Sequence, residues 1–347
     1  MKAFKKILSV LLAVALVLSF AACSKSNDDT KTDSDSKTSE TADLKEIVVS
    51  LDWTPNTNHT GLYVALQKGY YKDAGFDVKI VQPPEGDAIV ACSSGKVQYA
   101  IGYQDLLSSA FASDTPMEVT AVAAILQHNT SCIISKKGAG MDRPKGLTGK
   151  EYLTWQSPAE LAMMENIVNA DGGDWSKVKQ VPDVPTDEAR DVEANPNHAI
   201  WVYYGWGVIN AQVNNIDVDT FFIKDLNPVF DYYSPVLVAN NDYISSNPDD
   251  VKAFLAATQK GYEYAVENPD DAAQILIDSD ETGSLKGSEE LVKKSQQYMA
   301  DQYIADAPKW GYIDPARWNA FYNWINEEKL VDKELPENTG FTNDYLA

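Results

Sequence analysis

Short apolar strands and amphipathic helices alternate along residues 46–240 of this 347-residue chain, and this alternation restricts the fold more than any other feature. The first units are a strand at 46–51, a helix at 60–72, a strand at 76–81 and a helix at 86–95. Further strands are predicted at 98–102, 119–126, 151–155, 178–181, 199–203, 220–223 and 236–239. Strands that alternate with helices form a parallel or mixed sheet covered by helices, so the prediction is an α/β protein.

The length of the chain predicts two lobes, because a single hydrophobic core rarely grows beyond about 250–300 residues. From residue 248 onward the pattern is helical almost to the end. We expect lobe 1 to comprise residues 46–134 and 235–347, and lobe 2 residues 135–234, each a mixed sheet flanked by helices. Segments near 131–137 and 227–238 would form a two-segment hinge. A ligand would then lie in the cleft between the lobes, which would close around it.

The N-terminus has the form of a secretory signal. A basic start is followed by an apolar run from Ile7 to Ala22, shorter than the roughly 20 apolar residues that span a bilayer. Two alanines directly before Cys23 resemble the cleavage site of bacterial lipoproteins, although Phe20 departs from the aliphatic residue usual there. We expect residues 1–22 to be a lipoprotein signal peptide and Cys23 to be the lipid attachment point. Ordinary secretion with a free Cys23 is the alternative.

Residues 23–45 are nearly all Ser, Thr, Asp, Lys and Glu. Such a segment cannot bury enough apolar surface to offset the entropy lost on ordering. We therefore predict a flexible tether that joins a water-soluble body to the cell membrane. The expected location is extracytoplasmic, with the protein lipid-anchored.

The charge of the chain disfavours some partners. Lys and Arg number 29 and Asp and Glu 51, so the formal net charge is −22, which repels nucleic-acid phosphates and anionic lipid. The three histidines are scattered, and neither a metal nor a cofactor is expected. Cys92 and Cys132 either pair or remain two separate buried thiols, because sequence does not place their Cα atoms.

The most informative motif lies between the first strand and the first helix. Residues 52–61 read DWTPNTNHTG and contain a Trp-x-Pro-Asn-x-x-His-x-Gly run. Together with the lipoprotein signal and the two-lobed α/β body, this motif resembles the substrate-binding lipoproteins of ABC importers. The resemblance is to the branch that binds thiamine pyrimidine precursors, which is related to the thiamine pyrimidine synthases. Weaker supporting segments are 68–71, 102–104, 146–150, 261–265 and 268–270. The resemblance implies a type II periplasmic-binding-protein-like fold.

Candidate ligand-binding residues follow the predicted strands of lobe 1. Trp53 offers a flat face for stacking on a heteroaromatic ring. Asn56 and His59 supply the mixed donors and acceptors that an aminopyrimidine edge needs. Their structural alternatives are a core tryptophan, a capping asparagine and a buried histidine. The remaining candidates in this lobe are Tyr103, Gln104 and Gln127.

The second lobe contributes an aromatic cluster at 201–207, which reads WVYYGWG. We expect Tyr204 and Trp206 to form the wall opposite Trp53, with ordinary lobe packing as the alternative. The resemblance leads us to expect an acidic partner for an amino-substituted ring. No acid lies within the cluster, so the predicted site is aromatic and nearly neutral.

The sequence thus predicts a solute-binding protein of an ABC importer and no enzymatic activity. The favoured ligand is a thiamine pyrimidine precursor of the formylaminopyrimidine or hydroxymethylpyrimidine type. The resemblance implies a permease with its ATPase as partners, and a monomer is expected. Riboflavin or an alkanesulfonate is the alternative ligand. A pyrimidine-synthase-like enzyme is a remote alternative, because the cysteine-rich motif of those enzymes has no counterpart in two cysteines 40 positions apart.

Overall fold

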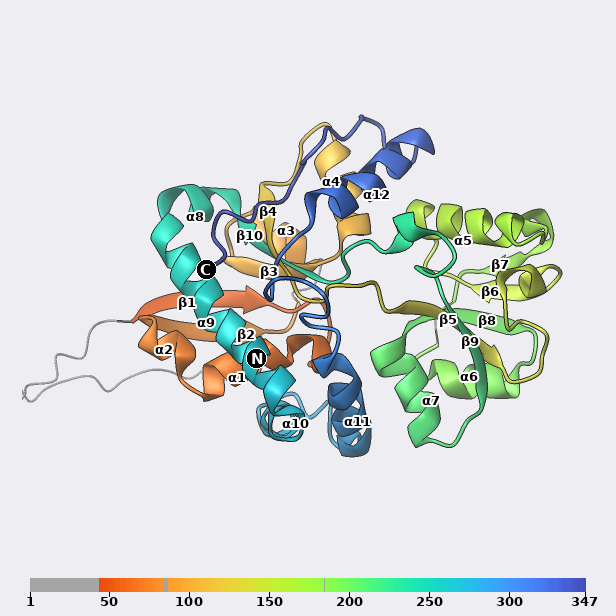
Figure 1. Cartoon of the computed structure of the whole chain (residues 1–347), viewed down its shortest axis with the longest axis horizontal. Helices are drawn as coiled ribbons and strands as arrows, with labels where there is room; N and C mark the ends of the chain where they lie inside the picture. The colour runs from red at the N-terminus through yellow and green to blue at the C-terminus, as the bar shows by residue number, and fades with distance from the viewer. Residues whose placement is uncertain (1–43, 84–86, 184) are drawn as a thin grey trace, which may run out of the picture. The chain divides into compact units, whose positions relative to one another are not determined.

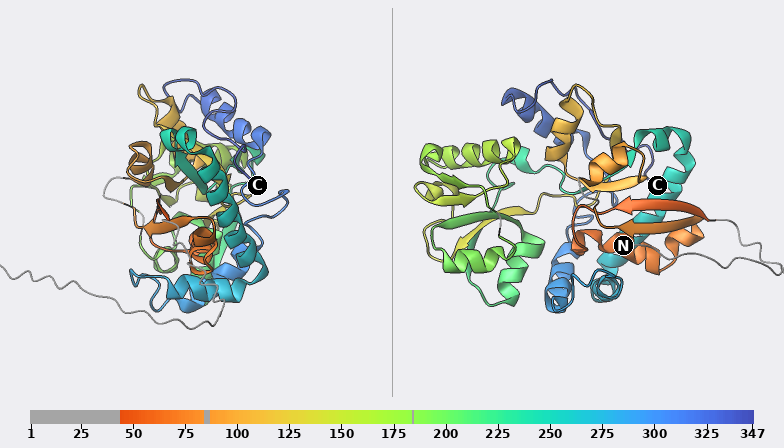
Figure 2. Two further views of the ribbon diagram at one scale, coloured as in Figure 1. Left: turned by 90° about the vertical axis from the view of Figure 1, so that its left-hand side faces the viewer. Right: turned by 180° about the vertical axis from the view of Figure 1, so that it is seen from behind.

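The computed structural model of this protein describes residues 44–83, 87–183 and 185–347, and residues 42–347 form one compact unit. Two five-stranded sheets organise this unit, with helices around each of them (Figure 1). The strand orders are β2-β1-β3-β10-β4 and β7-β6-β8-β5-β9. The view from behind shows the same division into two sheets (Figure 2, right). The predicted α/β class with two mixed sheets is therefore confirmed.

The first sheet takes strands from distant parts of the chain. Strand β1 (Lys45–Ser50) pairs in parallel with β2 (Phe76–Val81) and β3 (Tyr99–Gly102). Strand β10 (Val236–Asn240) enters between β3 and β4 (Val119–Ala124) and runs antiparallel to both. The sheet is thus mixed, and the carboxyl ends of β1 and β3 lie at the same edge.

The second sheet is built from one continuous stretch of chain. Strand β6 (Glu151–Leu153) pairs in parallel with β7 (Lys179–Val181) and β8 (His198–Tyr203). Strand β5 (Ser131–Lys136) runs antiparallel to β8 and to β9 (Val218–Phe222). This sheet is therefore an insertion into the chain that forms the first one.

Helices cover both sheets (Figure 1). Those around the second sheet are α5 (Pro158–Ala170), α6 (Glu188–Ala194) and α7 (Ile209–Val213). The others are α1 (Thr60–Gln67), α2 (Tyr70–Asp73), α3 (Ala88–Ser93), α4 (Gln104–Ala112), α8 (Asn241–Ser246), α9 (Pro248–Glu267), α10 (Pro269–Asp278), α11 (Glu289–Ala300) and α12 (Pro315–Glu327). Within the three described ranges, the helices all fall short of the length and apolar character that crossing a membrane requires.

Local sequence explains where several helices begin and end. The single helix predicted at 60–72 is two helices, because Gly69 adopts a left-handed φ of 79° between α1 and α2. Helix α5 begins as predicted at Ser157 and Pro158, with Ser157 and Glu160 forming a capping box. Helix α7 follows the aromatic cluster 201–207, as predicted. The short helices α6 and α8 have no counterpart in the prediction, since each has too few turns to show a clear period.

The chain passes between the sheets twice, before β5 and before β10. Residues 131–136, predicted within a connecting segment, form strand β5, so the first passage occupies residues 125–130. The second passage lies between β9 and β10. The carboxylate of Asp231 joins the two passages, because it accepts from the backbone N–H of Asn129 at 2.8 Å and contacts His128 Nδ1 at 2.6 Å.

Several predictions about single segments can be compared with the structure. Cys92 in α3 and Cys132 in β5 are both buried and free. The predicted signal peptide, Cys23 and nearly all of the predicted tether lie outside the described residues. Lys45, the last residue of that tether as predicted, is the first residue of β1.

Helices α1 and α9 pack closely because glycines face each other at their contact. A Cβ atom placed on Gly261 would lie 2.0 Å from the carbonyl oxygen of Gly61. A Cβ atom on Gly61 would lie 2.2 Å from the ring of Tyr262, which is fully buried. Helices α1 and α9 can therefore pack this closely only if neither Gly61 nor Gly261 is replaced by a residue with a Cβ atom.

We predict that Gly261→Ala lowers the free energy of unfolding by about 1–3 kcal/mol, because the added methyl group meets backbone atoms rather than a movable side chain. Urea unfolding followed by circular dichroism measures the change. The control is Lys260→Ala at the adjacent exposed position of α9, where a change within about 0.5 kcal/mol is expected. An unchanged midpoint for Gly261→Ala would show that α1 can shift away from α9.

Candidate functional site

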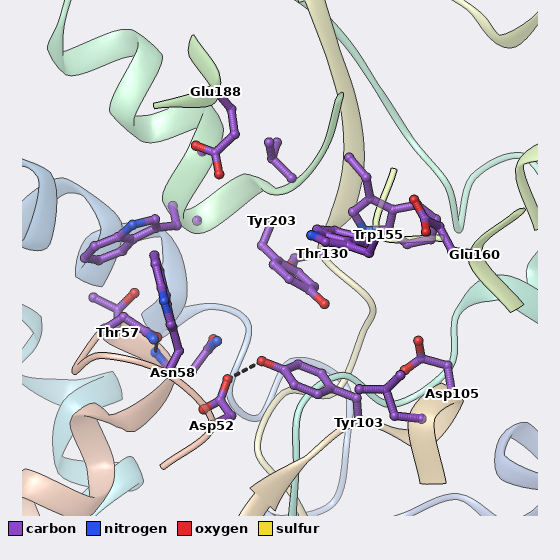
Figure 3. Close-up of a pocket in the computed structure, with 18 of the residues that line it drawn as sticks. Asp52, Thr57, Asn58, Tyr103, Asp105, Thr130, Trp155, Glu160, Glu188 and Tyr203 are labelled. Atoms are coloured by element: carbon purple, nitrogen blue, oxygen red, sulfur yellow. Dashed lines mark hydrogen bonds between the residues drawn. The ribbon is translucent and has the colours of Figure 1, made fainter. Parts of the chain in front are cut away.

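A cavity of about 550 Å³ lies between residues of the first and the second sheet (Figure 3). Its size falls within the range of small-molecule sites. It is lined from the first sheet by residues that follow β1 and β3, and from the second by residues that follow β6 and end β8. Carboxyl ends of parallel strands and the helix starts behind them commonly form ligand sites in α/β proteins.

Aromatic side chains form much of the lining. Trp53 and Trp155 are 54% and 49% exposed, so each presents a free ring face to a ligand. Trp155 meets Trp201 edge-on, with ring centroids 6.1 Å apart. Tyr103 and Tyr203 stack at 6.3 Å, one from each sheet. The cavity can therefore hold a flat ring by stacking.

Four carboxylates also line the cavity, and none of its lining residues in the described part of the chain is Lys, Arg or His. Figure 3 shows them at separate points around the cavity. They are Asp52, Asp105, Glu160 and Glu188. The cavity is thus acidic, which corrects the nearly neutral site expected from the sequence. The prediction rested on the aromatic cluster at 201–207, which contains no acid, whereas the four acids come from other segments of the chain.

Asp52 is held by two side chains. One carboxylate oxygen contacts His59 Nε2 at 2.7 Å, and the other accepts from the hydroxyl of Tyr103. Because His59 Nδ1 accepts from the backbone N–H of Asn56 at 3.2 Å, Nε2 must carry the proton given to Asp52. Burial opposes ionisation of Asp52, but the facing His59 and the hydrogen bonds from His59 and Tyr103 outweigh it and lower its pKa. Asp52 is therefore an ionised lining residue of the cavity, held in one orientation.

Glu160 is also held, by donors from β6 and from the turn between β6 and α5. Its carboxylate accepts from Tyr152 Oη at 2.6 Å, from Thr154 Oγ1 at 2.9 Å and from the backbone N–H of Ser157 at 3.3 Å. Burial raises its pKa even though these donors oppose the shift. The bonds fix the turn that carries Trp155 to the cavity.

Asp105 and Glu188 differ from the other two acids. They lie in the first turns of α4 and α6. Neither carboxylate has a hydrogen bond or ion pair with another side chain among the described residues. Burial raises the pKa of Asp105 to about 6, with nearby Glu160 adding to the shift, and burial also raises the pKa of Glu188.

Four of the residues predicted from the sequence line the cavity: Trp53, Asn56, Tyr103 and Trp206. Asn56 also has the capping role weighed as its alternative, since its Oδ1 accepts from the backbone N–H of Asn58 at 2.9 Å. Trp206 reaches the cavity from a π-helical turn, Tyr204–Val208, directly after β8.

The other four predicted residues lie behind the lining. His59 is fully buried against Asp52. Gln104 and Gln127 donate to the backbone carbonyls of Trp318 and Tyr312, at 2.9 and 3.0 Å. Tyr204 packs between Phe222 and Tyr298, with ring centroids 5.2 and 4.8 Å away.

Several lining residues were not singled out from the sequence, although a signal for them existed. Asp52 directly follows the predicted strand 46–51, and Trp155 ends the predicted strand 151–155. Asp105 begins the helix predicted after 98–102. Each thus stands at a strand end or helix start, where the α/β pattern places ligand contacts.

Comparison with known proteins gives three findings. The family described as "NMT1/THI5 like" matches residues 56–272. A formylaminopyrimidine-binding protein of Halalkalibacterium halodurans is 29% identical over 348 residues, which cover 99% of each chain. A 4-amino-5-hydroxymethyl-2-methylpyrimidine phosphate synthase of Saccharomyces cerevisiae is 21% identical over 254 residues, 67% of this chain and 71% of the synthase.

Solved structures confirm the fold predicted from the sequence. The ligand binding component of an ABC-type import system from Staphylococcus aureus superposes with a TM-score of 0.62 at 15% identity. The superposition covers 86% of this chain and 96% of that protein. The two-sheet arrangement is that of type II periplasmic binding proteins.

We predict that Asp52→Asn destabilises the protein by about 1–3 kcal/mol near pH 7, because the buried donors of His59 and Tyr103 lose a charged acceptor. The folded-state pKa of Asp52 is lowered, so its stabilising contribution is present above the ordinary value of 3.8. It is lost as the pH falls through the lower folded-state value.

Urea unfolding of parent and variant between pH 7 and pH 3 measures this difference, which should shrink below pH 3.8. Asp77→Asn, at an exposed position of β2, is the control. A difference that stays constant over the whole series would show that the charge of Asp52 contributes nothing.

Proposed function

The chain belongs to the NMT1/THI5-like family, and from that membership we propose that it is the solute-binding protein of an ABC importer for a thiamine pyrimidine precursor. A formylaminopyrimidine is the favoured ligand. The relative that aligns over 99% of both chains is a protein that binds this compound. The likeness in fold to a component of an ABC-type import system supports the transport role.

The observation that carries the proposal is the cavity between the two sheets, in which exposed tryptophan faces stand beside carboxylates. A pyrimidine ring is flat and stacks on Trp53 or Trp155. Its amino group donates hydrogen bonds, and ionised carboxylates accept them. We propose that Trp53, Asn56, Tyr103 and Trp206 contact the ligand, whereas His59 acts through Asp52.

The acidity of the cavity counts against an alkanesulfonate as ligand. A sulfonate is an anion, and anion sites offer basic side chains or free helix-start amides. Here the first turns of α4, α5 and α6 carry Asp105, Glu160 and Glu188, which place negative charge where an anion would have to bind. Riboflavin stays in the test below, since it is also a flat ring.

We propose binding without catalysis. The related synthases are 20–22% identical and align over 67–87% of this chain, whereas the binding protein is 29% identical and aligns over 99% of it. Captured ligand would be delivered to a permease with its ATPase, by a monomer anchored at Cys23 outside the cytoplasm.

The proposal includes closure of two lobes, 46–134 with 235–347 and 135–234. The two passages between the sheets would serve as the hinge. Their support is the bond network of Asp231, which ties the passages to each other at the level of the cavity. A hinge of two joined segments restricts the motion to opening and closing of the cleft.

Calorimetric titration of the full chain with formylaminopyrimidine, hydroxymethylpyrimidine, thiamine, riboflavin and taurine tests the proposal. We expect heat with the pyrimidines and none with taurine. Trp53→Ala should weaken binding about tenfold or more, since stacking of a base on an aromatic ring is worth about 1–3 kcal/mol.

The control for that variant is Val90→Ala, which removes an exposed apolar side chain of α3 outside the cavity lining. Its affinity should equal that of the parent. Binding of riboflavin or taurine in place of every pyrimidine would refute the proposed ligand class. An unchanged affinity of Trp53→Ala would refute the stacking role of Trp53.

A further inference from the structure

The four carboxylates of the cavity divide into two kinds. Asp52 and Glu160 are occupied by donors of the protein, which hold each of them in one orientation. Asp105 and Glu188 have no such side-chain donors among the described residues. Backbone N–H groups at the starts of α4 and α6 do donate to them, and these bonds oppose the rise of their pKa values. Because a carboxylate has about four acceptor sites, each of the two can accept further hydrogen bonds from a ligand.

Of Asp105 and Glu188, Asp105 is the better placed to contact a ligand ring. It follows Tyr103 by two residues, at the point where β3 turns into α4. Figure 3 shows it near Tyr103 at the edge of the cavity opposite Glu188. Tyrosines from both sheets surround it, and its charge contributes to the raised pKa values of Tyr103, Tyr203, Tyr232 and Tyr322.

Glu160 faces Asp105 from the other sheet, and the two negative charges oppose each other. No cation among the lining residues that the structure describes offsets this repulsion. A ligand that brings N–H donors or a positive charge to Asp105 relieves it. A ligand that brings further negative charge increases it.

We propose that Asp105 determines the specificity of this site: it accepts hydrogen bonds from the amino-bearing, protonatable edge of an unphosphorylated pyrimidine, and with its neighbouring carboxylates it excludes the phosphate ester of the same compound. This inference rests on the proposed function and names the chemical form of the ligand. The relative from Saccharomyces cerevisiae is named a synthase of the phosphate of such a pyrimidine. The two proteins would then handle different forms of one ring.

The raised pKa of Asp105 makes binding depend on pH. Asp105, with a pKa of about 6, is largely protonated at pH 5 and ionised at pH 7.5, so it becomes a better acceptor as the pH rises. The titratable groups that face it are Glu160, Tyr103, Tyr203, Tyr232 and Tyr322. Burial raises the pKa of these four tyrosines, so they stay neutral over this interval. Asn does not titrate, so the difference in pH dependence between the parent and Asp105→Asn measures the contribution of Asp105.

The test is calorimetric titration of the full chain with 4-amino-5-hydroxymethyl-2-methylpyrimidine and with its phosphate, at pH 5.0 and 7.5. These probes differ only in the ester. We expect the parent to bind the free alcohol at least about 100-fold more tightly than the phosphate at pH 7.5. Asp105→Asn should lose about tenfold or more in affinity for the alcohol, bind the phosphate no more weakly than the parent, and show a flatter pH dependence.

The matched control is Asp114→Asn. It removes the same charge two residues after the end of α4, where the side chain is 99% exposed. Its affinities should equal those of the parent. Circular dichroism confirms the folding of each variant, and the preference of the parent for the alcohol over the phosphate tests the inference without any variant.

The outcomes separate this inference from the function on which it rests. Equal affinity of the parent for alcohol and phosphate, or equal affinity of parent and Asp105→Asn for the alcohol, overturns the inference and leaves pyrimidine binding intact. If the parent binds none of the three compounds (formylaminopyrimidine, the alcohol and the phosphate), both the inference and the proposed function are overturned. If it binds formylaminopyrimidine but not the alcohol, only the inference is overturned.

Discussion

The antiparallel insertion of β10 between β3 and β4 fixes how the two sheets are joined. All five residues of β10 are buried, and the strand returns to the first sheet only after the whole second sheet has been built. Because the chain leaves through 125–130 and comes back before β10, the second sheet is attached at two points instead of one. A single attachment would leave its orientation free. The double attachment keeps the carboxyl ends of β6 and β8 beside those of β1 and β3, and the cavity lies there.

The chemistry of that cavity follows from which groups the fold supplies with donors. Asp52 receives them from His59 and Tyr103, and Glu160 receives them from Tyr152 of β6 and from the turn before α5. Both acids are therefore structural as well as lining groups. Asp105 and Glu188 receive none from other side chains in the described residues. A site with aromatic faces and carboxylates that have acceptor sites left for a ligand suits a flat, hydrogen-bond-donating compound. The chain has a large negative net charge, and the lining of the cavity is likewise acidic.

Much of the fold could be predicted, because its signals are local. Strand 76–81 alternates apolar and polar residues and forms β2 with the predicted bounds, and Ser157-Pro158 marks the start of α5. The residues of the site are harder to predict than the fold. Trp53 and Trp206 were found because an aromatic residue at a strand end is conspicuous. Tyr204, two positions before Trp206, turns instead toward Phe222 and Tyr298, since the π-helical turn that begins there directs neighbouring side chains to different sides.

Local signals are enough to predict the α/β class, the two mixed sheets and the loops from which a ligand site can be built, because hydrophobic period and turn residues act over a few positions. Which side chains of those loops face the cavity depends on contacts between segments that are far apart in the sequence. His59 and Gln104 carry the chemistry of ligand contacts, yet the partners that bury them, Asp52 and the backbone of Trp318 and Tyr233, lie where only the folded chain brings them. The same holds for the acidity of the site. Asp105 and Glu160 are 55 positions apart in sequence and come to face each other because the chain passes between the two sheets twice.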